Sequence, residues 1–276
     1  MLINYKLLLN FMLYKSIIMI LKLLNRLVTD FYKIEIFRTC ISFLRFFVLF
    51  KILRRNFKFK NKIEITDDHI ELHRDNKILG VDDHNLHYSE NLFDIKKTYN
   101  QFSGGKTKLI TMPLGSIDYL DFDNSKVLSV GPRNEGELYF IRSLGFKWKN
   151  ISSIDLLSYS SKIKLGDIHD TDYQDNYFDV IVCGWVIPYS NNYKKILDEI
   201  YRITNNKGIL CVGYTYIPEE QDKIRKYKKN ENRFNSNQQI IEHYGEKIKN
   251  VYFNFDAYSD NKNHKRQSIF VCRINK

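Results

Sequence analysis

From residue 126 onward, short apolar runs alternate regularly with amphipathic stretches, and this alternation constrains the fold more than any other feature of the chain. The apolar runs predict strands at 126–130, 151–155, 163–167, 178–183 and 207–213. The clearest amphipathic stretch, Tyr193 to Thr204, places Ile196, Leu197, Ile200 and Ile203 on one face of a helix. Strands that alternate with helices predict an α/β fold, a doubly wound sheet of parallel strands joined by crossover helices.

The C-terminal part of the chain has a different pattern. A further helix is predicted at 238–244. Val251 to Phe255 and Ser268 to Ile274 then alternate like strands with no helix between them, so they are expected to pair antiparallel. The sequence therefore predicts a mostly parallel, seven-stranded sheet that ends in an antiparallel C-terminal hairpin.

The first predicted strand leads into a turn that runs from Gly131 to Gly136. In an open α/β sheet the ligand lies beyond the carboxyl ends of the strands, so this turn is expected to line the site. A pyrophosphate needs free backbone N–H groups and no nearby negative charge. Pro132 supplies no N–H group, and Glu135 and Glu137 would repel phosphates. A cationic ligand without phosphates is compatible with this turn.

Five segments then follow one another in a recognisable order: VLSVGPRNEGEL, ISSIDL, KLGDIHD, NYFDVIVCGWVIPYS and ILDEIYRITNNKGILCVG. Together they resemble the motifs of the class I S-adenosylmethionine-dependent methyltransferases over roughly residues 126–215. The resemblance implies S-adenosylmethionine as the cofactor, which carries a sulfonium and an ammonium but no phosphate. The chain departs from the family pattern at Ser129, in place of an acid, and at Arg133, in place of the second glycine. Glu135 or Glu137 is a candidate for the missing carboxylate.

The resemblance also implies roles for individual residues. Gly131 and Gly136 would let the backbone approach the cofactor closely. Asp155, followed by Leu156, would accept the ribose hydroxyls, and Asp167 with Ile168 would hold the adenine edge. Cys183, Gly184 and Trp185 would line the methyl donor and the substrate. Three structural readings stay open: a helix-capping Asp155, a competing role for Asp170 or Asp172 in place of Asp167, and a packing role for Trp185.

Methyl transfer to a hydroxyl group requires that its proton be removed. His169 is the candidate base, with Tyr189 next, although a surface or capping role for His169 is also open. The loop VIPY lacks the Asn/Asp-Pro-Pro-aromatic signature of enzymes that methylate amino groups of bases. We therefore expect a small-molecule, sugar or lipid-linked acceptor, and no nucleic-acid partner.

Residues 61–125 are polar and mixed, which indicates a linker or lid. Ile63 and Ile65 alternate with Ile70 and Leu72 around a turn at 66–69, which predicts a small hairpin. Histidines lie near several aspartates in this segment, but without a convincing ligand spacing, so no metal site is expected (His69, His73, His84, His87). The four cysteines are far apart in sequence, which suits a reducing cytoplasm.

Residues 1–60 carry almost all of the net charge of +11, because they hold twelve basic residues and only two acids, Asp30 and Glu35. The longest uncharged run, Leu7 to Tyr14, is too short to span a membrane, and no signal-cleavage site follows. Basic residues recur along one side of a predicted helix (Lys15, Lys22, Arg26, Lys33). This pattern favours an anchor at the inner membrane surface. Helices that pack on the core or dimerise, and a nucleic-acid-binding segment, are the alternatives.

The sequence thus predicts three parts: a helical segment at 1–60, a linker or lid at 61–125 and a methyltransferase domain at 126–276. The predicted function is methyl transfer from S-adenosylmethionine in the cytoplasm, at the inner membrane face. Two other readings compete with it. One is a non-catalytic, methyltransferase-like binding protein, and the other is a dinucleotide or nucleotide-sugar enzyme on a similar sheet.

Overall fold

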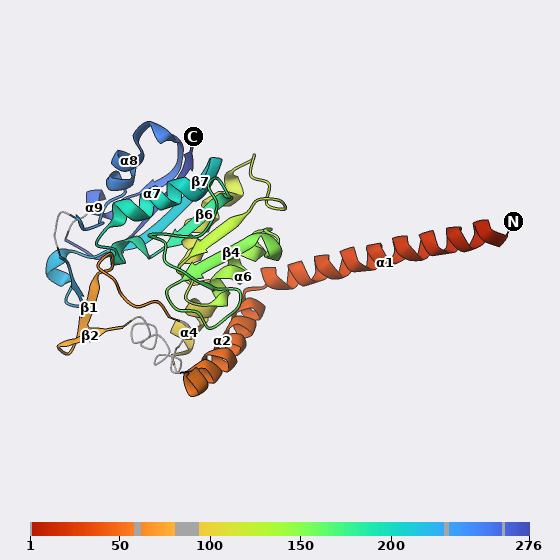
Figure 1. Cartoon of the computed structure of the whole chain (residues 1–276), viewed down its shortest axis with the longest axis horizontal. Coiled ribbons are helices and arrows are strands. Elements are labelled where there is room, and N and C mark those ends of the chain that lie inside the picture. The colour runs from red at the N-terminus through yellow and green to blue at the C-terminus, as the bar shows by residue number, and fades with distance from the viewer. Residues whose placement is uncertain (1, 58–61, 81–93, 229–231, 261–262) are drawn as a thin grey trace.

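The centre of the molecule is a seven-stranded mixed sheet, seen in a computed structural model that describes residues 2–57, 62–80, 94–228, 232–260 and 263–276 (Figure 1). The spatial order of the strands is β5-β4-β3-β6-β7-β10-β9. The first five run parallel, and β10 pairs antiparallel with both β7 and β9. The predicted fold class is confirmed. The strands are β3 (Val127–Val130), β4 (Ile151–Asp155), β5 (Lys164–Leu165), β6 (Phe178–Gly184), β7 (Thr204–Tyr216), β9 (Ile248–Phe255) and β10 (Arg266–Ile274).

The strand order reverses at the centre of the sheet. The chain moves outward from β3 to β4 and β5, and then crosses to β6 on the other side of β3. Val130, the last residue of β3, lies between Ile154 of β4 and Cys183 of β6. Because ligands of doubly wound sheets bind at such a switch point, the carboxyl ends of these three strands are where a site is expected.

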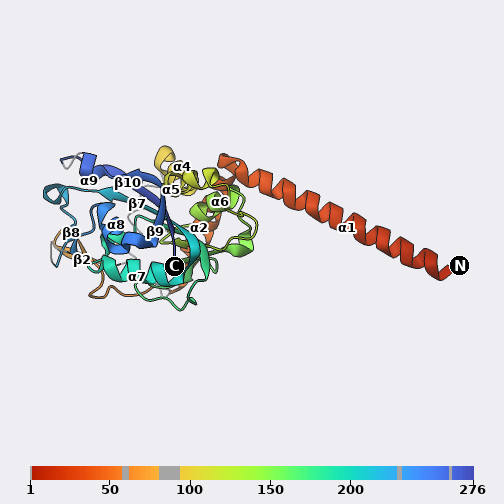
Figure 2. The ribbon, with the colours of Figure 1, turned by 90° about the horizontal axis from the view of Figure 1, so that it is seen from above.

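Helices cover both faces of the sheet (Figures 1 and 2). One face is covered by α7 (Tyr193–Ile203) and α8 (Gln238–Tyr244), and all four apolar residues predicted for α7 are fully buried there. The other face is covered by α6 (Glu135–Ser143) and by helices from the first half of the chain. A short helix, α9 (Ala257–Asp260), lies between β9 and β10.

The segment predicted as a linker or lid supplies part of this second layer. Its helices are α4 (Ile95–Phe102), α5 (Thr107–Thr111) and the 3-10 helix η1 (Met112–Ser116). Phe102, Ile110 and Leu114 are completely buried against the sheet and α6. Residues 95–117 therefore form part of the core that covers the sheet.

The hairpin predicted around residues 66–69 is wrong in position. The observed hairpin joins β1 (Glu71–Arg74) to β2 (Lys77–Leu79) through Asp75 and Asn76, which both have a positive φ, and β1 also pairs with β8 (Arg225–Lys226). Ile63 instead hydrogen-bonds to Leu156, after β4. The first half of the alternating pattern, at Ile63, thus pairs with the segment after β4, while the second half, at Leu72, pairs with β2. As a result, residues 62–70 run across the carboxyl end of the sheet.

Two helices form the N-terminal segment. Helix α2 (Glu35–Phe57) packs on α4 and α6 and buries Phe46 and Phe50, while α1 (Leu2–Lys33) projects away from the body (Figures 1 and 2). They are separated at Ile34. In the described part of the chain, no helix combines the length and apolarity needed to cross a bilayer.

Candidate functional site

A pocket that is open to solvent and has an interior volume of about 150 Å³ lies at the carboxyl ends of β3, β4 and β6. The turn after β3, the ends of β4 and β6, and the segment after β5 form its walls. Residues 65–80 contribute a further wall from the N-terminal half of the chain. The predicted site residues that line it are Gly131, Asp155, Leu156, Asp167, Ile168, His169, Gly184, Trp185 and Tyr189.

The turn after β3 is held in a conformation that its sequence explains. Gly131 has a φ of +65°, and a Cβ there would lie 2.4 Å from Val186 Cγ2, so only glycine fits. Arg133 follows with a φ of +47° and donates its backbone N–H to Asp155 Oδ2 at 3.1 Å. Asn134 then caps α6 by accepting the N–H of Gly136 at 2.8 Å. The carboxylate that ends β4 therefore also fixes the turn that ends β3.

Asp155 is the best-placed acceptor in this part of the pocket. Its Oδ1 accepts the backbone N–H of Leu157 at 3.2 Å, so each carboxylate oxygen is oriented by one N–H group. Burial raises the pKa of Asp155, against the opposing effect of these hydrogen bonds. Hydroxyl donors from a ligand would satisfy the remaining acceptor capacity of this carboxylate.

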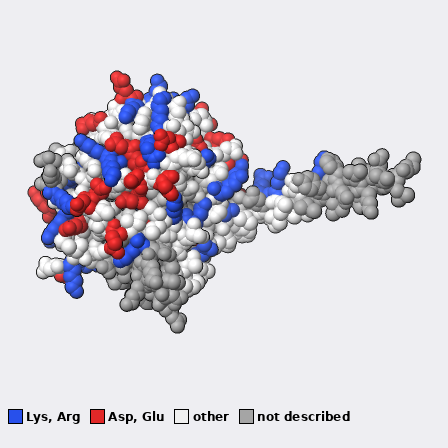
Figure 3. Space-filling view, in the orientation of Figure 1, with Lys and Arg blue, Asp and Glu red and all other residues white. Residues whose placement is uncertain are grey.

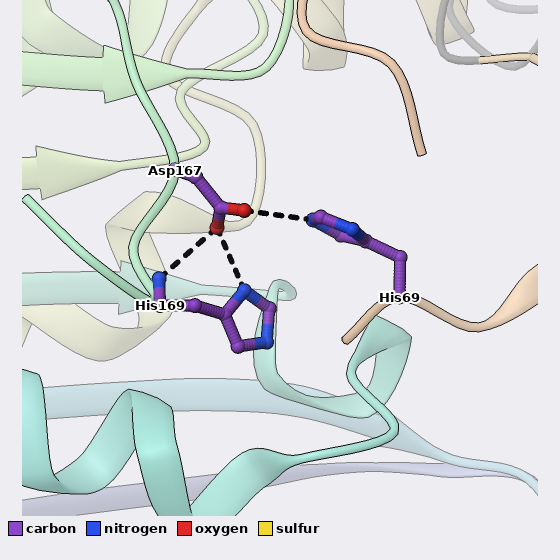
Figure 4. Close-up of side chains that lie close together, drawn as sticks. All are labelled: His69, Asp167 and His169. Carbon is purple, nitrogen blue, oxygen red and sulfur yellow. Dashed lines mark hydrogen bonds and ion pairs between the residues drawn. The ribbon is translucent and has the colours of Figure 1, made fainter. Parts of the chain in front are cut away.

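At the other end of the pocket, one carboxylate lies between two imidazoles (Figure 4). Asp167 Oδ1 is 2.7 Å from His169 Nδ1 and accepts the backbone N–H of His169 at 3.0 Å. Its Oδ2 is 3.3 Å from His69 Nε2. Burial would raise the pKa of Asp167, but the hydrogen bonds from His169 and the close contact with the His69 imidazole hold it well below its usual value. Asp167 is therefore ionised, and the two histidines satisfy the oxygens that the sequence analysis expected to face adenine.

The outer nitrogens of both histidines also have partners. His169 Nε2 is 2.7 Å from Ser190 Oγ, and His69 Nδ1 is 2.9 Å from Thr66 Oγ1. The backbone of the His69 segment is fixed as well, because Ile70 N–H donates to Tyr189 O and Asn191 N–H donates to Asp68 O. Both imidazoles are thus oriented from behind, with their inner nitrogens directed toward Asp167.

Four candidate residues do not line the pocket. The side chain of Glu135 is completely buried in an ion pair with Arg45 of α2. Gly136 packs closely against the backbone of α4 and not against the pocket, since a Cβ there would lie 2.3 Å from the carbonyl oxygen of Phe102. Cys183 is in the core, where burial raises the pKa of its thiol to about 12. Glu137 also stays outside the lining, and burial raises its pKa to about 8 although Thr107 donates a hydrogen bond to it.

Trp185, directly after β6, combines two of the roles that the sequence left open. It lines the pocket with a φ of +58°, a conformation that is strained for a bulky residue. Its indole N–H donates to Thr215 Oγ1 and Gln267 Oε1, both at 2.9 Å, which anchors the ring to β7 and β10. The ring is therefore a fixed wall of the site.

Sequence reasoning missed His69 and Ser190 as members of the site. His69 was assigned to a solvated lid, because its neighbours Asp67 and Asp68 are polar and its ligand spacing is irregular. Of the other histidines considered, His73 pairs with Glu71 at 3.1 Å, and His84 and His87 lie outside the described residues. His69 reaches residues 189–191 through contacts between segments far apart in the sequence, and no local sequence pattern predicts such contacts.

Comparison with known proteins adds to this geometry. Residues 146–212, from the end of the turn after α6 to β7, match the family described as Methyltransferase domain. This match supports the resemblance to the class I S-adenosylmethionine-dependent methyltransferases that the motifs over residues 126–215 indicate. The matched segment comprises 67 of the 276 residues, and its family implies S-adenosylmethionine as the methyl donor.

No curated protein matches the sequence of this chain. Among solved structures, it is similar to a putative sarcosine dimethylglycine methyltransferase from Galdieria sulphuraria, with 11% identity, a TM-score of 0.47 and coverage of 64% of this chain and 88% of that one. It is also similar to a SAM-dependent methyltransferase from Aquifex aeolicus, with 14% identity and a TM-score of 0.41. That match covers 61% of this chain and 93% of the other. The [4+2]-cyclase SpnF is similar with 14% identity and a TM-score of 0.44, over 64% of this chain and 83% of the other. These similarities do not identify a methyl acceptor.

Proposed function

We propose that this protein is a methyltransferase that binds S-adenosylmethionine between the Gly131 turn and Asp155, and methylates a small-molecule, sugar or lipid-linked acceptor at the His169 end of the pocket. The observation that carries the proposal is the convergence of residues from separate motifs. Gly131, Asp155, Asp167 and Gly184 lie at or just after the ends of four different strands, yet all line one pocket. An in-line displacement needs the donor methyl group and the acceptor held together, and a single pocket with two chemically different ends can do this.

Calorimetry tests the cofactor assignment directly. Titration of the full chain with S-adenosylmethionine, or with its demethylated product, should give micromolar binding, while NAD should give no heat. Binding of NAD and of neither sulfur compound would refute the proposal in favour of a dinucleotide enzyme. Binding without any methyl transfer would favour a methyltransferase-like binding protein. To detect transfer, methyl-labelled cofactor is incubated with separate pools of water-soluble metabolites and membrane lipids.

His169 is proposed to take part in removing the proton of the acceptor. It is buried at the pocket wall and oriented by Asp167 on one side and Ser190 on the other. His169→Ala should lower turnover by about 10²-fold while the affinity for S-adenosylmethionine changes little. His243→Ala is the matched control, since His243 pairs with Asp198 on the outer surface. Equal turnover in both variants would return His169 to a structural role, and Tyr189 would be the next residue to replace.

The projecting helix supports the proposal that the enzyme works at an anionic membrane surface. Four of its basic residues, Lys15, Lys22, Arg26 and Lys33, lie within about 40° of one another on a helical wheel, and its exposed apolar side chains lie mainly on the opposite side. The apolar group is Met19, Ile20, Leu21, Leu23, Leu24, Leu27, Val28 and Phe31. Figure 3 shows basic side chains on this helix, whereas both signs of charge are mixed over the body. A helix of this kind suits the boundary between lipid headgroups and acyl chains.

The full chain is therefore expected to float with vesicles that contain anionic lipid, and less with neutral vesicles. Each basic side chain near an anionic surface contributes about 1 kcal/mol, so Lys22→Gln with Arg26→Gln should weaken vesicle binding roughly 30-fold. Salt should release only part of the bound protein, because apolar burial is not screened. The same two replacements at Lys147 and Lys149, on the body, serve as the control. If the full chain ignores both kinds of vesicle, α1 is not an anchor.

A further inference from the structure

His69, Asp167 and His169 bring three potential metal ligands to one wall of the pocket. Their donor atoms all lie within 4.8 Å of one another. The side chains of His69 and His169 are only 8% and 4% exposed, so this cluster is not an accident of a solvated surface. Donor atoms that bind one first-row transition-metal ion at about 2.0–2.2 Å lie at most about 4.4 Å apart, so small side-chain rotations would close the site.

The inner nitrogen of His69, Nε2, lacks a well-formed hydrogen bond to any residue that the structure describes. His69 Nε2 is buried and makes no hydrogen bond of good geometry within the described residues; the nearest oxygen is Asp167 Oδ2 at 3.3 Å. A buried polar atom without a good partner is costly, and a bound ion is one of the ordinary explanations. Figure 4 shows this nitrogen and His169 Nδ1 both directed at the Asp167 carboxylate, and the three donor atoms lie close together.

The surroundings of the two histidines match what a metal-binding imidazole needs. Such an imidazole gives its inner lone pair to the ion and donates its outer N–H to an oxygen. Ser190 Oγ, 2.7 Å from His169 Nε2, can accept that hydrogen bond. Thr66 Oγ1, 2.9 Å from His69 Nδ1, can do the same. In the metal-free protein, His69 Nδ1 can instead accept the backbone N–H of Thr66 at 3.1 Å, so both states of His69 have a partner.

We propose that His69, Asp167 and His169 bind one divalent transition-metal ion, of the Zn²⁺ or Fe²⁺ type, at the acceptor end of the pocket. Two imidazoles and one carboxylate suit these ions, whereas Mg²⁺ and Ca²⁺ prefer sets of oxygen ligands. Three protein ligands leave at least one coordination position free, and the pocket lies beside it. An acceptor hydroxyl bound there would lose its proton more readily, because coordination to a cation lowers its pKa.

Metal binding can be measured without knowing the acceptor. Tag-free full-length protein, stripped with a chelator, is titrated with Co²⁺ by visible absorption and with Zn²⁺ by calorimetry. We expect one equivalent to bind at micromolar strength or tighter, and millimolar Mg²⁺ not to compete. His69→Ala and Asp167→Asn should each weaken binding by at least about 100-fold. His73→Ala, which removes a histidine of the neighbouring strand, should leave the affinity unchanged.

The wild-type titration alone can overturn the proposal, whatever the variants do. No Co²⁺ absorption band and no Zn²⁺ heat would refute it. Binding that survives the combined His69→Ala and His169→Ala replacement in a protein with an unchanged circular dichroism spectrum would also refute it. The affinity for S-adenosylmethionine, measured on the metal-free protein, reports separately on the proposed function. Metal binding without cofactor binding would contradict the methyl-transfer proposal and leave the metal site standing.

Discussion

Replacing Arg45 with methionine is expected to lower the free energy of unfolding by about 3–5 kcal/mol. Arg45 donates to both carboxylate oxygens of Glu135, with Nη2 at 3.0 Å from Oε1 and Nε paired with Oε2. Glu135 is completely buried, so the replacement would leave a carboxylate with only neutral partners, Ser160 and Tyr139. Denaturant unfolding followed by circular dichroism measures the change.

A second replacement shows whether the buried charge is the cause. Adding Glu135→Gln to Arg45→Met removes the uncompensated carboxylate and should recover a large part of the loss. Arg26→Met, on the exposed part of α1, should change stability by less than about 0.5 kcal/mol. If Arg45→Met is no more harmful than Arg26→Met, the stability of the protein does not depend on this ion pair.

Asp155→Ala should weaken S-adenosylmethionine binding by about 3 kcal/mol, or roughly 150-fold. The proposed ribose hydroxyls would lose a charged acceptor, and the Gly131 turn would lose the carboxylate that accepts the N–H of Arg133. Calorimetric titration of the folded variant measures the effect. Because the carboxylate lies at the end of a central strand, its loss should alter the pocket far more than the sheet.

Two controls separate the contact with the cofactor from the fixing of the turn. Asp155→Asn keeps an acceptor of the same shape, so it should bind more tightly than Asp155→Ala but more weakly than the wild type. Asp172→Ala removes an acid that pairs with Lys164 on the surface and should leave binding unchanged. Wild-type affinity in Asp155→Ala would place the cofactor elsewhere and refute the proposed binding mode.

The sequence predicted the sheet well because its signals are local. Strand and helix periodicities depend on neighbouring residues, and β4 and α8 were predicted with their observed ends. Most of the predicted site residues line the pocket for a related reason. They lie at or just after the ends of strands, and a parallel sheet brings the carboxyl ends of its strands to one edge.

The parts that sequence reasoning missed depend on contacts between distant segments. Arg45 and Glu135 are 90 residues apart, and Ser190 reaches the carbonyl of Asp68 across 122 residues. Glu135 was therefore assigned to the ligand, because nothing near it in sequence showed an arginine that would neutralise it. His69 was assigned to a solvated lid for the same reason. Composition placed the positive charge in residues 1–60 but could not show that α2 packs on the core while α1 projects from it.

The connection between α1 and α2 makes the N-terminal helix a rigid spacer. Only Ile34 separates the two helices, and α2 is fixed by Arg45 to the first residue of α6, directly after the Gly131 turn. A helix of 32 residues is about 48 Å long, and α1 is continuous from Leu2 to Lys33. A surface that held α1 would therefore hold the mouth of the pocket within a limited range of distances and orientations. Reach, as well as pocket chemistry, would then select which acceptors are methylated.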